Sequence, residues 1–230
     1  MLKRALLVVA KRPAVGQTKT RLCPPLSGEE AAAIYDCLLR DTLALVRLAR
    51  QQLAFDPILC YLPAGAENYF REIAPDFALE LQAGRDLSER LQHATTTALT
   101  ERNYDQVVIM DSDSPTLLPD YLCQAFAALD NVDVSLGPCD DGGYYLIGLK
   151  RPAPALFLKV QMSTPQVVAD TLAIAQSLDL QVAQLPGSFD IDYVADLRRL
   201  TEALDQLPAS VAVHTRAFMN GHRAILEREQ

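Results

Sequence analysis

Apolar runs of strand length alternate with segments of helical periodicity along most of the chain. The run at 5–10 is continuously apolar, which is typical of a central strand covered by helices on both faces. Repeated alternation of strand and helix predicts an α/β fold with a mixed, mostly parallel sheet and helices on both faces. The expected strands are 5–10, 57–62, 77–81, 106–110, 132–137, 144–149 and 181–185.

The longest helical pattern begins at Ser27, which forms the sequence pattern of a capping box with Glu30. Its apolar residues recur at helical spacing to about residue 52. No linker, low-complexity tract or internal repeat interrupts the chain, so residues 1–230 are expected to form a single domain. Further helices are expected at 66–73, 86–101, 118–129, 165–178, 194–204 and 208–227.

Composition and charge exclude several classes of protein. With 230 residues, half of them apolar, the chain is long enough for a substantial core. A net charge of −8 argues against nucleic acid as a partner, because nucleic-acid grooves carry a basic face. No apolar run reaches the roughly 18 residues of a membrane span. The N-terminus also lacks the pattern of a signal peptide, so we expect a cytoplasmic protein.

A basic loop follows the first expected strand. It reads KRPAVGQTKTRL and offers Lys11, Arg12, Lys19 and Arg21 around Gly16. Cationic side chains and backbone N–H groups at a glycine turn suit phosphate groups, although the loop is not a Walker A sequence. The simpler alternative is a solvated basic loop. Because parallel sheets bind ligands beyond the carboxyl ends of their strands, we expect this loop to bind the phosphates of a nucleotide.

Two Asp-x-Asp segments carry the candidate metal ligands. Asp111 and Asp113 directly follow the strand at 106–110, and Asp190 and Asp192 lie near the C-terminal end of the fold. In an extended chain, residues two positions apart point to the same side. We predict that Asp113 and Asp192 hold one divalent cation with Asp190 as a further ligand, and that Asp111 contributes to nucleotide binding. The alternative for the second segment is capping of the helix that follows.

The segment PCDDGGYY joins two expected strands. Asp140, Asp141, Gly142 and Gly143 have the composition of a hairpin turn. The glycines also allow a backbone to approach a ligand closely, and Tyr144 suits stacking on a base or sugar. We predict that these residues bind the acceptor or sugar, with Asp141 orienting or deprotonating the acceptor. A plain hairpin turn is the alternative.

The cysteines indicate no special chemistry. Five of them, at positions 23, 37, 60, 123 and 139, are odd in number and show no C-x-x-C spacing. Reduced, mostly buried thiols are therefore expected, and a zinc site is not. Cys23 and Cys139 lie next to candidate site residues, but nothing nearby supplies the histidine base that a catalytic thiol needs.

The joint order of these motifs resembles a bacterial glycosyltransferase family that is linked to arsenosugar biosynthesis and radical-SAM neighbourhoods. The similarity covers nearly the whole chain. The chain departs from the family pattern at Asp111, where Gly is usual, and at Met162, where the family often has the Trp of W-S-T. The matching segments are K-x-P-x-x-G-x-x-K-T-R-L at 11–22, D-L-x-E-R at 86–90, D-S-P at 113–115, D-G-G-Y-Y-L-I-G-L at 141–149 and D-x-D-x-x-x-D-L at 190–197.

The resemblance implies a single-domain, Rossmann-like nucleotide-diphospho-sugar transferase fold of the GT-A type. Relatives of that fold include nucleotidyltransferases for molybdopterin, phospholactate and sugar phosphates. By the same resemblance, Asp113 and Asp192 match metal-binding positions, and Asp86 and Arg90 join the nucleotide-binding residues. The implied cofactor is Mg²⁺ or Mn²⁺, and the implied partners are a nucleotide or nucleotide-sugar and a small-molecule acceptor.

The implied activity is glycosyl transfer from a nucleoside diphosphate sugar. The alternative is nucleotidyl transfer, in which a phosphorylated acceptor attacks the α-phosphate of a nucleoside triphosphate and pyrophosphate leaves. In either reaction Lys19 and Arg21 would act catalytically by stabilising negative charge on phosphate oxygens. A degenerate nucleotide-binding or scaffold protein is a third possibility, but every candidate carboxylate and cation is present in the chain.

Overall fold

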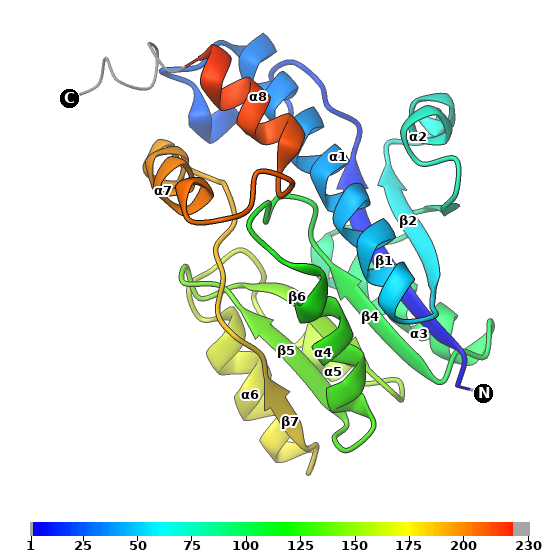
Figure 1. Ribbon diagram of the computed structural model, residues 1–230. Coiled ribbons are helices and arrows are strands. Elements are labelled where there is room, and N and C mark those ends of the chain that lie inside the picture. Colours follow the sequence, from blue (N-terminus) through cyan, green and yellow to red (C-terminus); the bar gives the residue numbers. More distant parts are fainter. Residues whose placement is uncertain (1, 223–230) are drawn as a thin grey trace.

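The computed structural model describes residues 2–222 and contains a seven-stranded sheet (Figure 1). The order of the strands is β3-β2-β1-β4-β6-β5-β7, and only β6 runs antiparallel to its neighbours within the described residues. The predicted mixed, mostly parallel sheet is therefore confirmed. The strands are β1 (Arg4–Lys11), β2 (Asp56–Leu62), β3 (Ala78–Leu81), β4 (Gln106–Met110), β5 (Val134–Pro138), β6 (Tyr144–Leu149) and β7 (Val182–Gln184).

The two most apolar strands lie side by side in the middle of the sheet. Every residue of β4 is buried, and β1 is buried from Ala5 to Val8. Ala5 pairs with Asp56 of β2 on one side and with Val107 of β4 on the other. The carboxyl ends of β1, β4 and β5 thus meet at one edge of the sheet, together with the amino end of antiparallel β6. That carboxyl edge bears the loops with the candidate site residues.

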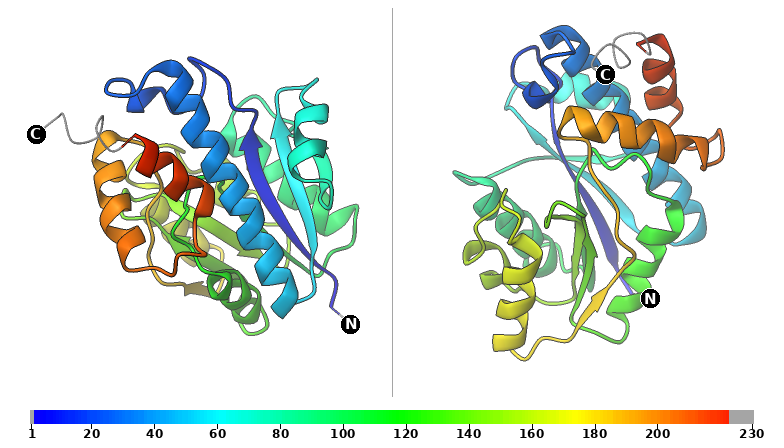
Figure 2. Two further views of the ribbon diagram at one scale, coloured as in Figure 1. Left: turned by 45° about the horizontal axis from the view of Figure 1, so that its top comes forward. Right: turned by 90° about the vertical axis from the view of Figure 1, so that its left-hand side faces the viewer.

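Helices cover both faces of the sheet (Figure 2). One face packs against α1, α2 and α4, and the other against α3, α5 and α6. The last two helices, α7 and α8, lie together near the beginning of α1 at the carboxyl edge (Figure 1). The helices are α1 (Gly28–Gln52), α2 (Glu67–Ile73), α3 (Leu87–Thr100), α4 (Pro119–Leu129), α5 (Ala155–Leu158), α6 (Val167–Ser177), α7 (Val194–Asp205) and α8 (Val213–Gly221), with a 3₁₀ turn η1 (Thr20–Leu22).

Three apolar clusters hold these layers together. The first contains Leu6 and Phe126 and lies between the sheet and helices α1, α2 and α4. The second contains Leu7 and Phe157 and lies on the opposite face of the sheet. The third joins η1, the first half of α1, α7 and α8 around the buried side chain of Ile191. Apolar packing therefore fixes the segment just before α7, which belongs to no strand of the sheet.

The helix boundaries mostly follow the sequence signals. The capping box is formed, since the Ser27 hydroxyl accepts from Glu30 N (3.2 Å) and the Glu30 carboxylate accepts from Ser27 N (2.7 Å). Helix α5 was not expected, because four residues are too few for a periodic pattern. The expected helix at 208–227 is wrong at its beginning, because Ala212 has a left-handed backbone (φ 55°) and α8 begins only at Val213. Residues 223–227 lie outside the described residues.

The lengths and apolar character of the helices also bear on membrane insertion. Among residues 2–222, no helix is both long enough and apolar enough to cross a bilayer. The longest, α1, carries charged residues in its first turn and in its last turn. Its apolar residues instead pack into the first and third clusters.

Asp41 of α1 fastens the beginning of α8 to the rest of the fold. Its buried carboxylate accepts hydrogen bonds from the backbone N–H groups of His214 (3.0 Å) and Thr215 (2.8 Å). We predict that Asp41→Ala lowers the free energy of unfolding by about 1–3 kcal/mol, because both N–H groups lose a charged acceptor. Urea denaturation followed by circular dichroism measures the change. The matched control is Asp205→Ala at the exposed end of α7, and equal stability of the two variants would contradict this role.

Candidate active site

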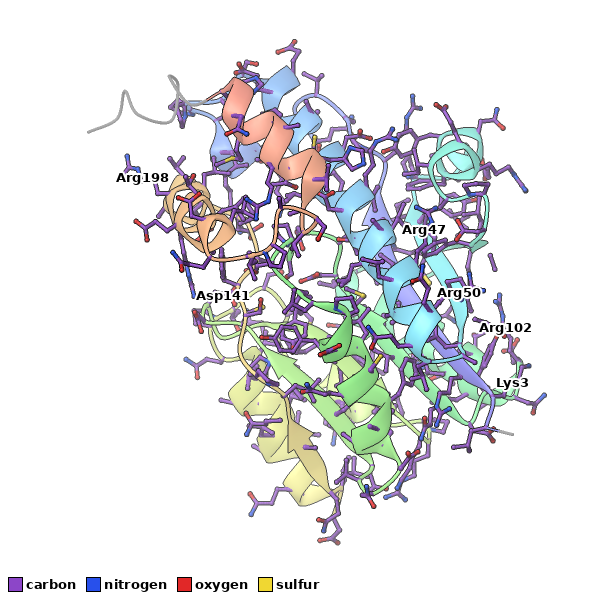
Figure 3. The ribbon with its side chains drawn as sticks, in the orientation of Figure 1. Lys3, Arg47, Arg50, Arg102, Asp141 and Arg198 are labelled. Carbon is purple, nitrogen blue, oxygen red and sulfur yellow. The ribbon has the colours of Figure 1, made fainter. Side chains whose placement is uncertain are left out.

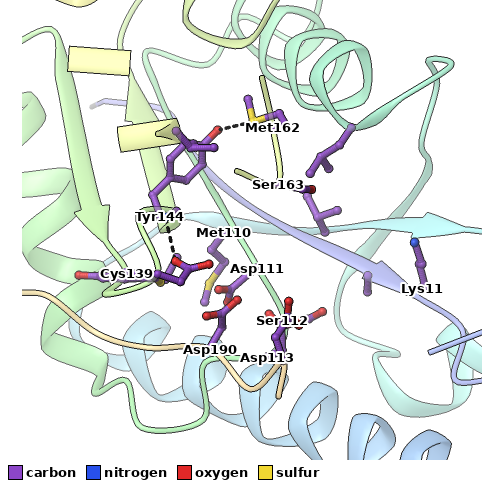
Figure 4. A pocket seen from close by; sticks show the side chains of 18 of the residues that line it. Lys11, Met110, Asp111, Ser112, Asp113, Cys139, Tyr144, Met162, Ser163 and Asp190 are labelled. Atoms are coloured by element: carbon purple, nitrogen blue, oxygen red, sulfur yellow. Dashed lines mark hydrogen bonds between the residues drawn. The ribbon is translucent and has the colours of Figure 1, made fainter. Parts of the chain in front are cut away.

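A pocket of about 660 Å³ opens at the carboxyl edge of the sheet (Figure 4). The loops after β1 and β4, the β5–β6 turn and the segment before α7 all contribute to its wall. Residues far apart in the sequence meet there because the strands that precede them end at the same edge. Of the predicted site residues, the pocket is lined by Lys11, Lys19, Arg21, Arg90, Asp111, Asp113, Asp141, Gly143, Tyr144, Asp190 and Asp192.

Lys19 joins the two Asp-x-Asp segments. Its ammonium group lies 2.5 Å from Asp113 Oδ2 and 2.8 Å from Asp192 Oδ1, and its side chain is only 6% exposed. Burial alone would lower the pKa of Lys19, but the two carboxylates outweigh burial and raise it. The residue also has a left-handed backbone (φ 50°), an uncommon conformation for a residue with a Cβ. The predicted approach of Asp113 and Asp192 is thus present, with an ammonium group between their carboxylates.

Arg21 lies at the rim of the pocket. Its guanidinium donates to Asp192 Oδ2 at 2.9 Å and lies 5.2 Å from the centre of the Tyr193 ring. Burial would raise the pKa of Asp192, but Lys19 and Arg21 outweigh burial and lower it. The Arg21 side chain remains 55% exposed, so it can contact both the carboxylate and a ligand in the pocket.

A second group of acidic side chains has a different environment. Atoms of Cys139, Asp141 and Asp190 that can bind a metal all lie within 4.8 Å of one another. Burial, together with Asp113, Asp141 and Asp192, raises the pKa of Asp190 to about 7. Burial and then Asp113 raise the pKa of Asp111, whose Oδ1 atom is buried with no hydrogen-bond partner among the described residues. This region therefore holds closely spaced carboxyl groups that repel one another.

Tyr35 and Gln82 are among the pocket residues that were not predicted from the sequence. The hydroxyl of Tyr35 accepts from Lys11 N (3.0 Å) and forms a hydrogen bond with Ser112 Oγ (2.9 Å), which ties α1 to the loops after β1 and β4. The amide of Gln82 donates to the carbonyl oxygens of Ala10 (3.1 Å) and Cys60 (2.8 Å). Tyr35 sits on the apolar face of α1, so its spacing marks it only as a core residue. Gln82 has no sequence signal at all.

Several predicted site residues have structural contacts instead. The Asp140 carboxylate accepts from Arg199 of α7. Asp86 is the N-cap of α3 and accepts from Glu89 N at 2.9 Å. A Cβ on Gly142 would lie 2.1 Å from the Pro165 carbonyl oxygen, so this glycine allows contact with the chain before α6. The remaining two, Arg12 and Gly16, do not line the pocket either.

Basic residues at the opposite end of the molecule are balanced by acidic neighbours (Figure 3). Arg47 and Arg50 lie near Asp76, at 2.6 and 3.8 Å respectively, and Arg102 lies 2.7 Å from Glu80. Asp141 lies at the carboxyl edge, well away from them (Figure 3). These balanced charges, on the side of the molecule away from the pocket, indicate surface ion pairs. They contrast with the concentrated charge in the pocket.

Several solved structures are similar to this chain. A protein of Desulfovibrio desulfuricans G20, provisionally named as a nucleotide-diphospho-sugar transferase, is 30% identical with a TM-score of 0.90, and the match covers 99% of this chain and 98% of that one. The 4-diphosphocytidyl-2C-methyl-D-erythritol synthase of Anaerococcus prevotii DSM 20548 is 13% identical with a TM-score of 0.59, covering 89% and 99%. Rv0371C of Mycobacterium tuberculosis H37Rv, in complex with manganese, is 18% identical with a TM-score of 0.54, covering 87% and 98%.

The sequence comparisons give the family. No curated protein matches the chain. The family described as "Uncharacterized protein conserved in bacteria (DUF2064)" matches residues 45–164, which is more than half of the chain. The structural matches confirm the predicted nucleotide-diphospho-sugar transferase fold. The chain therefore belongs to the DUF2064 family of bacterial proteins.

Proposed function

We propose that the protein is a transferase that acts on a nucleotide-activated donor, specifically a nucleoside diphosphate sugar. The observation that carries this proposal is the pocket itself, which places Lys19 and Arg21 beside the carboxylates of both Asp-x-Asp segments. A diphosphate needs cationic groups around its oxygens, and breaking its bond to the sugar needs compensation of the charge that develops on it. Donor binding at the carboxyl edge also agrees with the usual position of ligands in such sheets.

The chain's own residues have distinct roles in this proposal. Arg21 is exposed at the rim, where it can donate two parallel hydrogen bonds to a phosphate. Lys19 lies deeper and contributes a fixed positive charge between the two segments. Tyr144 lies partly buried in the pocket wall and suits contact with the sugar or acceptor.

The donor set of the pocket fits a divalent cation. Carboxylate oxygens are the ligands that hard divalent cations prefer. The Oδ1 atom of Asp111, which is buried without a hydrogen-bond partner among the described residues, supports such a fit. Asp113, Asp190 and Asp192 remain the proposed ligands, with Asp111 beside them. When bound, a divalent cation would neutralise charge on the diphosphate as the sugar leaves.

The comparison with the Desulfovibrio protein supports sugar transfer, because its provisional name is that of a nucleotide-diphospho-sugar transferase. Nucleotidyl transfer is the second candidate. It is favoured by the pair of cations on the loop after β1, which suits a transferring phosphoryl group, and by the cytidylyl chemistry in the name of the Anaerococcus synthase. The link to arsenosugar biosynthesis stays a prediction.

Thermal-shift screening separates the two reactions. With Mn²⁺ or Mg²⁺ present, we expect nucleoside diphosphate sugars to raise the melting temperature and to release nucleoside diphosphate once an acceptor is found, because ligands that bind only the folded state stabilise it. Stabilisation by triphosphates alone, with pyrophosphate release on addition of a phosphorylated acceptor, would establish nucleotidyl transfer instead. A lack of response to both classes of nucleotide would contradict both candidates.

Arg21 provides a direct test of the phosphate contacts. We predict that Arg21→Ala weakens binding of a nucleoside diphosphate by about tenfold or more, because a charged hydrogen bond contributes about 1.5–3 kcal/mol. Isothermal titration calorimetry measures the affinity. Lys19→Ala is a poorer test, since it leaves two partly buried carboxylates without their partner.

The matched control for Arg21 is Arg151→Ala. Arg151 is similarly exposed (57%, against 55% for Arg21) and lies 3.4 Å from Asp133, outside the pocket. Its replacement should leave nucleotide affinity unchanged. If Arg21→Ala behaves like this control, Arg21 does not contact the phosphates.

The crowded carboxylates should make the stability of the cation-free protein depend on pH. The pKa of Asp190 is raised from 3.8 to about 7, chiefly by burial and by Asp113 and Asp141. Between these values the unfolded chain releases this proton while the folded chain retains it, so stability falls as pH rises from about 4 to 7. Asp190→Asn should therefore raise the melting temperature in EDTA more at pH 8 than at pH 5. The control Asp205→Asn should show no such difference, and an equal gain at both pH values for Asp190→Asn would refute the prediction.

A further inference from the structure

A thiol lies among the carboxylates of the pocket. Cys139 follows β5, Asp141 lies in the β5–β6 turn and Asp190 belongs to the segment before α7. One ligand atom from each of these three residues lies within 4.8 Å of the other two. In a tetrahedral site with bonds of about 2.0–2.3 Å the ligand atoms lie about 3.3–3.8 Å apart, so these three atoms need to approach one another by no more than about 1.5 Å to bind one cation.

A further acidic side chain, Asp111, lines the same pocket. Asp111 Oδ1 is buried and has no hydrogen-bond partner among the described residues, while Oδ2 accepts from Ser114 at 2.7 Å. Figure 4 shows Asp111, Asp190 and Cys139 directed into the same pocket from three separate segments. A buried carboxylate oxygen without a partner is costly, and a cation would satisfy it.

The distribution of positive charge also favours this position. Within the described residues, Lys19 and Arg21 make their ion pairs with Asp113 and Asp192, on one side of the pocket. Among residues 2–222, no ion pair within 4.0 Å involves Asp111, Asp141 or Asp190. The excess negative charge therefore lies beside the thiol and not between Asp113 and Asp192.

The segments that carry the three ligands are held in register by the backbone. Asp140 N donates to Ser188 O (3.1 Å), and Ser188 N donates to Pro138 O (3.0 Å). Arg199 donates to Asp140 and lies 4.0 Å from the centre of the Phe189 ring, so α7 fixes both segments. Backbone contacts and Arg199 therefore hold the two segments close, and Asp141 Oδ1 also accepts from Gly143 N at 2.8 Å within the turn.

We propose that Cys139, Asp141 and Asp190, with Asp111 beside them, bind a divalent transition-metal cation through mixed sulfur and oxygen ligands. The proposal deepens the proposed function, on which it rests for the role of the cation in transfer. A thiolate is a soft ligand that favours Zn²⁺ or Co²⁺ over Mg²⁺ and Ca²⁺, which select oxygen. The thiol releases its proton to solvent when the sulfur binds. This set shares Asp190 with the oxygen-only set of Asp113, Asp190 and Asp192 given under the proposed function, and a sulfur–metal bond decides between the two sets.

Cobalt provides a direct test, because a bond between sulfur and Co²⁺ gives a near-ultraviolet charge-transfer band that oxygen ligands do not give. We expect titration of the purified full chain with Co²⁺ to produce this band. Cys139→Ser should abolish it, whereas the control Cys123→Ser should retain it. Cys123 lies outside the pocket and donates to the Gln52 side chain.

A second variant, Asp141→Asn, tests the proposal even if Cys139→Ser does not fold. Asp141→Asn retains the thiol, so it should show the band at saturation but require on the order of tenfold more Co²⁺. Circular dichroism establishes that each variant is folded. The absence of the band from the wild-type protein, its persistence in folded Cys139→Ser, or unchanged Co²⁺ affinity in Asp141→Asn would overturn the proposal.

The cobalt spectrum tests the thiol ligand and the transfer assay tests the proposed function, so one can give a negative result without the other. Transfer activity with Mg²⁺ and no sulfur band would leave the proposed function in place and remove the thiol ligand. A sulfur band in a protein that responds to no nucleotide would establish the mixed-ligand site and remove the proposed function.

Discussion

The ammonium group of Lys19 holds the carboxyl edge of the sheet together. It contacts Asp113 after β4 and Asp192 before α7, and Lys19 itself follows β1. Removing this charge from water is costly, so the arrangement is stable only while both carboxylates remain close. Three segments from distant parts of the sequence are therefore constrained to one another at a single point. The rest of the pocket is arranged around that point.

Much of the fold follows from local signals in the sequence. The continuous apolar runs of β1 and β4 predict central strands, and the Ser27 capping box predicts the beginning of α1. The beginning of α8 could not be predicted, because it depends on Asp41, a residue more than 170 positions away. Helix α5 is too short to produce a periodic pattern. Prediction therefore fails where an element is too short to produce a pattern, as in α5, or where its partner lies far away in the sequence, as in α8.

In the candidate site, too, local sequence signals predict some residues, whereas others depend on contacts with distant parts of the chain. The two Asp-x-Asp segments and Lys19 were predicted because strand ends of a parallel sheet meet at one edge. Asp140 and Cys139 were harder to interpret, because adjacent residues of one turn face different surroundings. Asp140 contacts α7 and Cys139 lies beside Asp190. Which residue of a turn faces the pocket depends on the packing of α7, which the local sequence does not contain.

The middle residue of each Asp-x-Asp segment explains how the carboxylates can remain available to a ligand. Ser112 is buried and bonds to the Tyr35 hydroxyl, and Ile191 is buried in the third apolar cluster. Ile191 N also donates to Asp113 O at 3.2 Å, which links the two segments directly. Anchoring the middle residue of each segment limits where its two flanking carboxylates can lie, and all four carboxylates line the pocket. These anchors add to the Lys19 ion pairs, so the two segments stay in place when a carboxylate oxygen changes partner on binding a cation or phosphate.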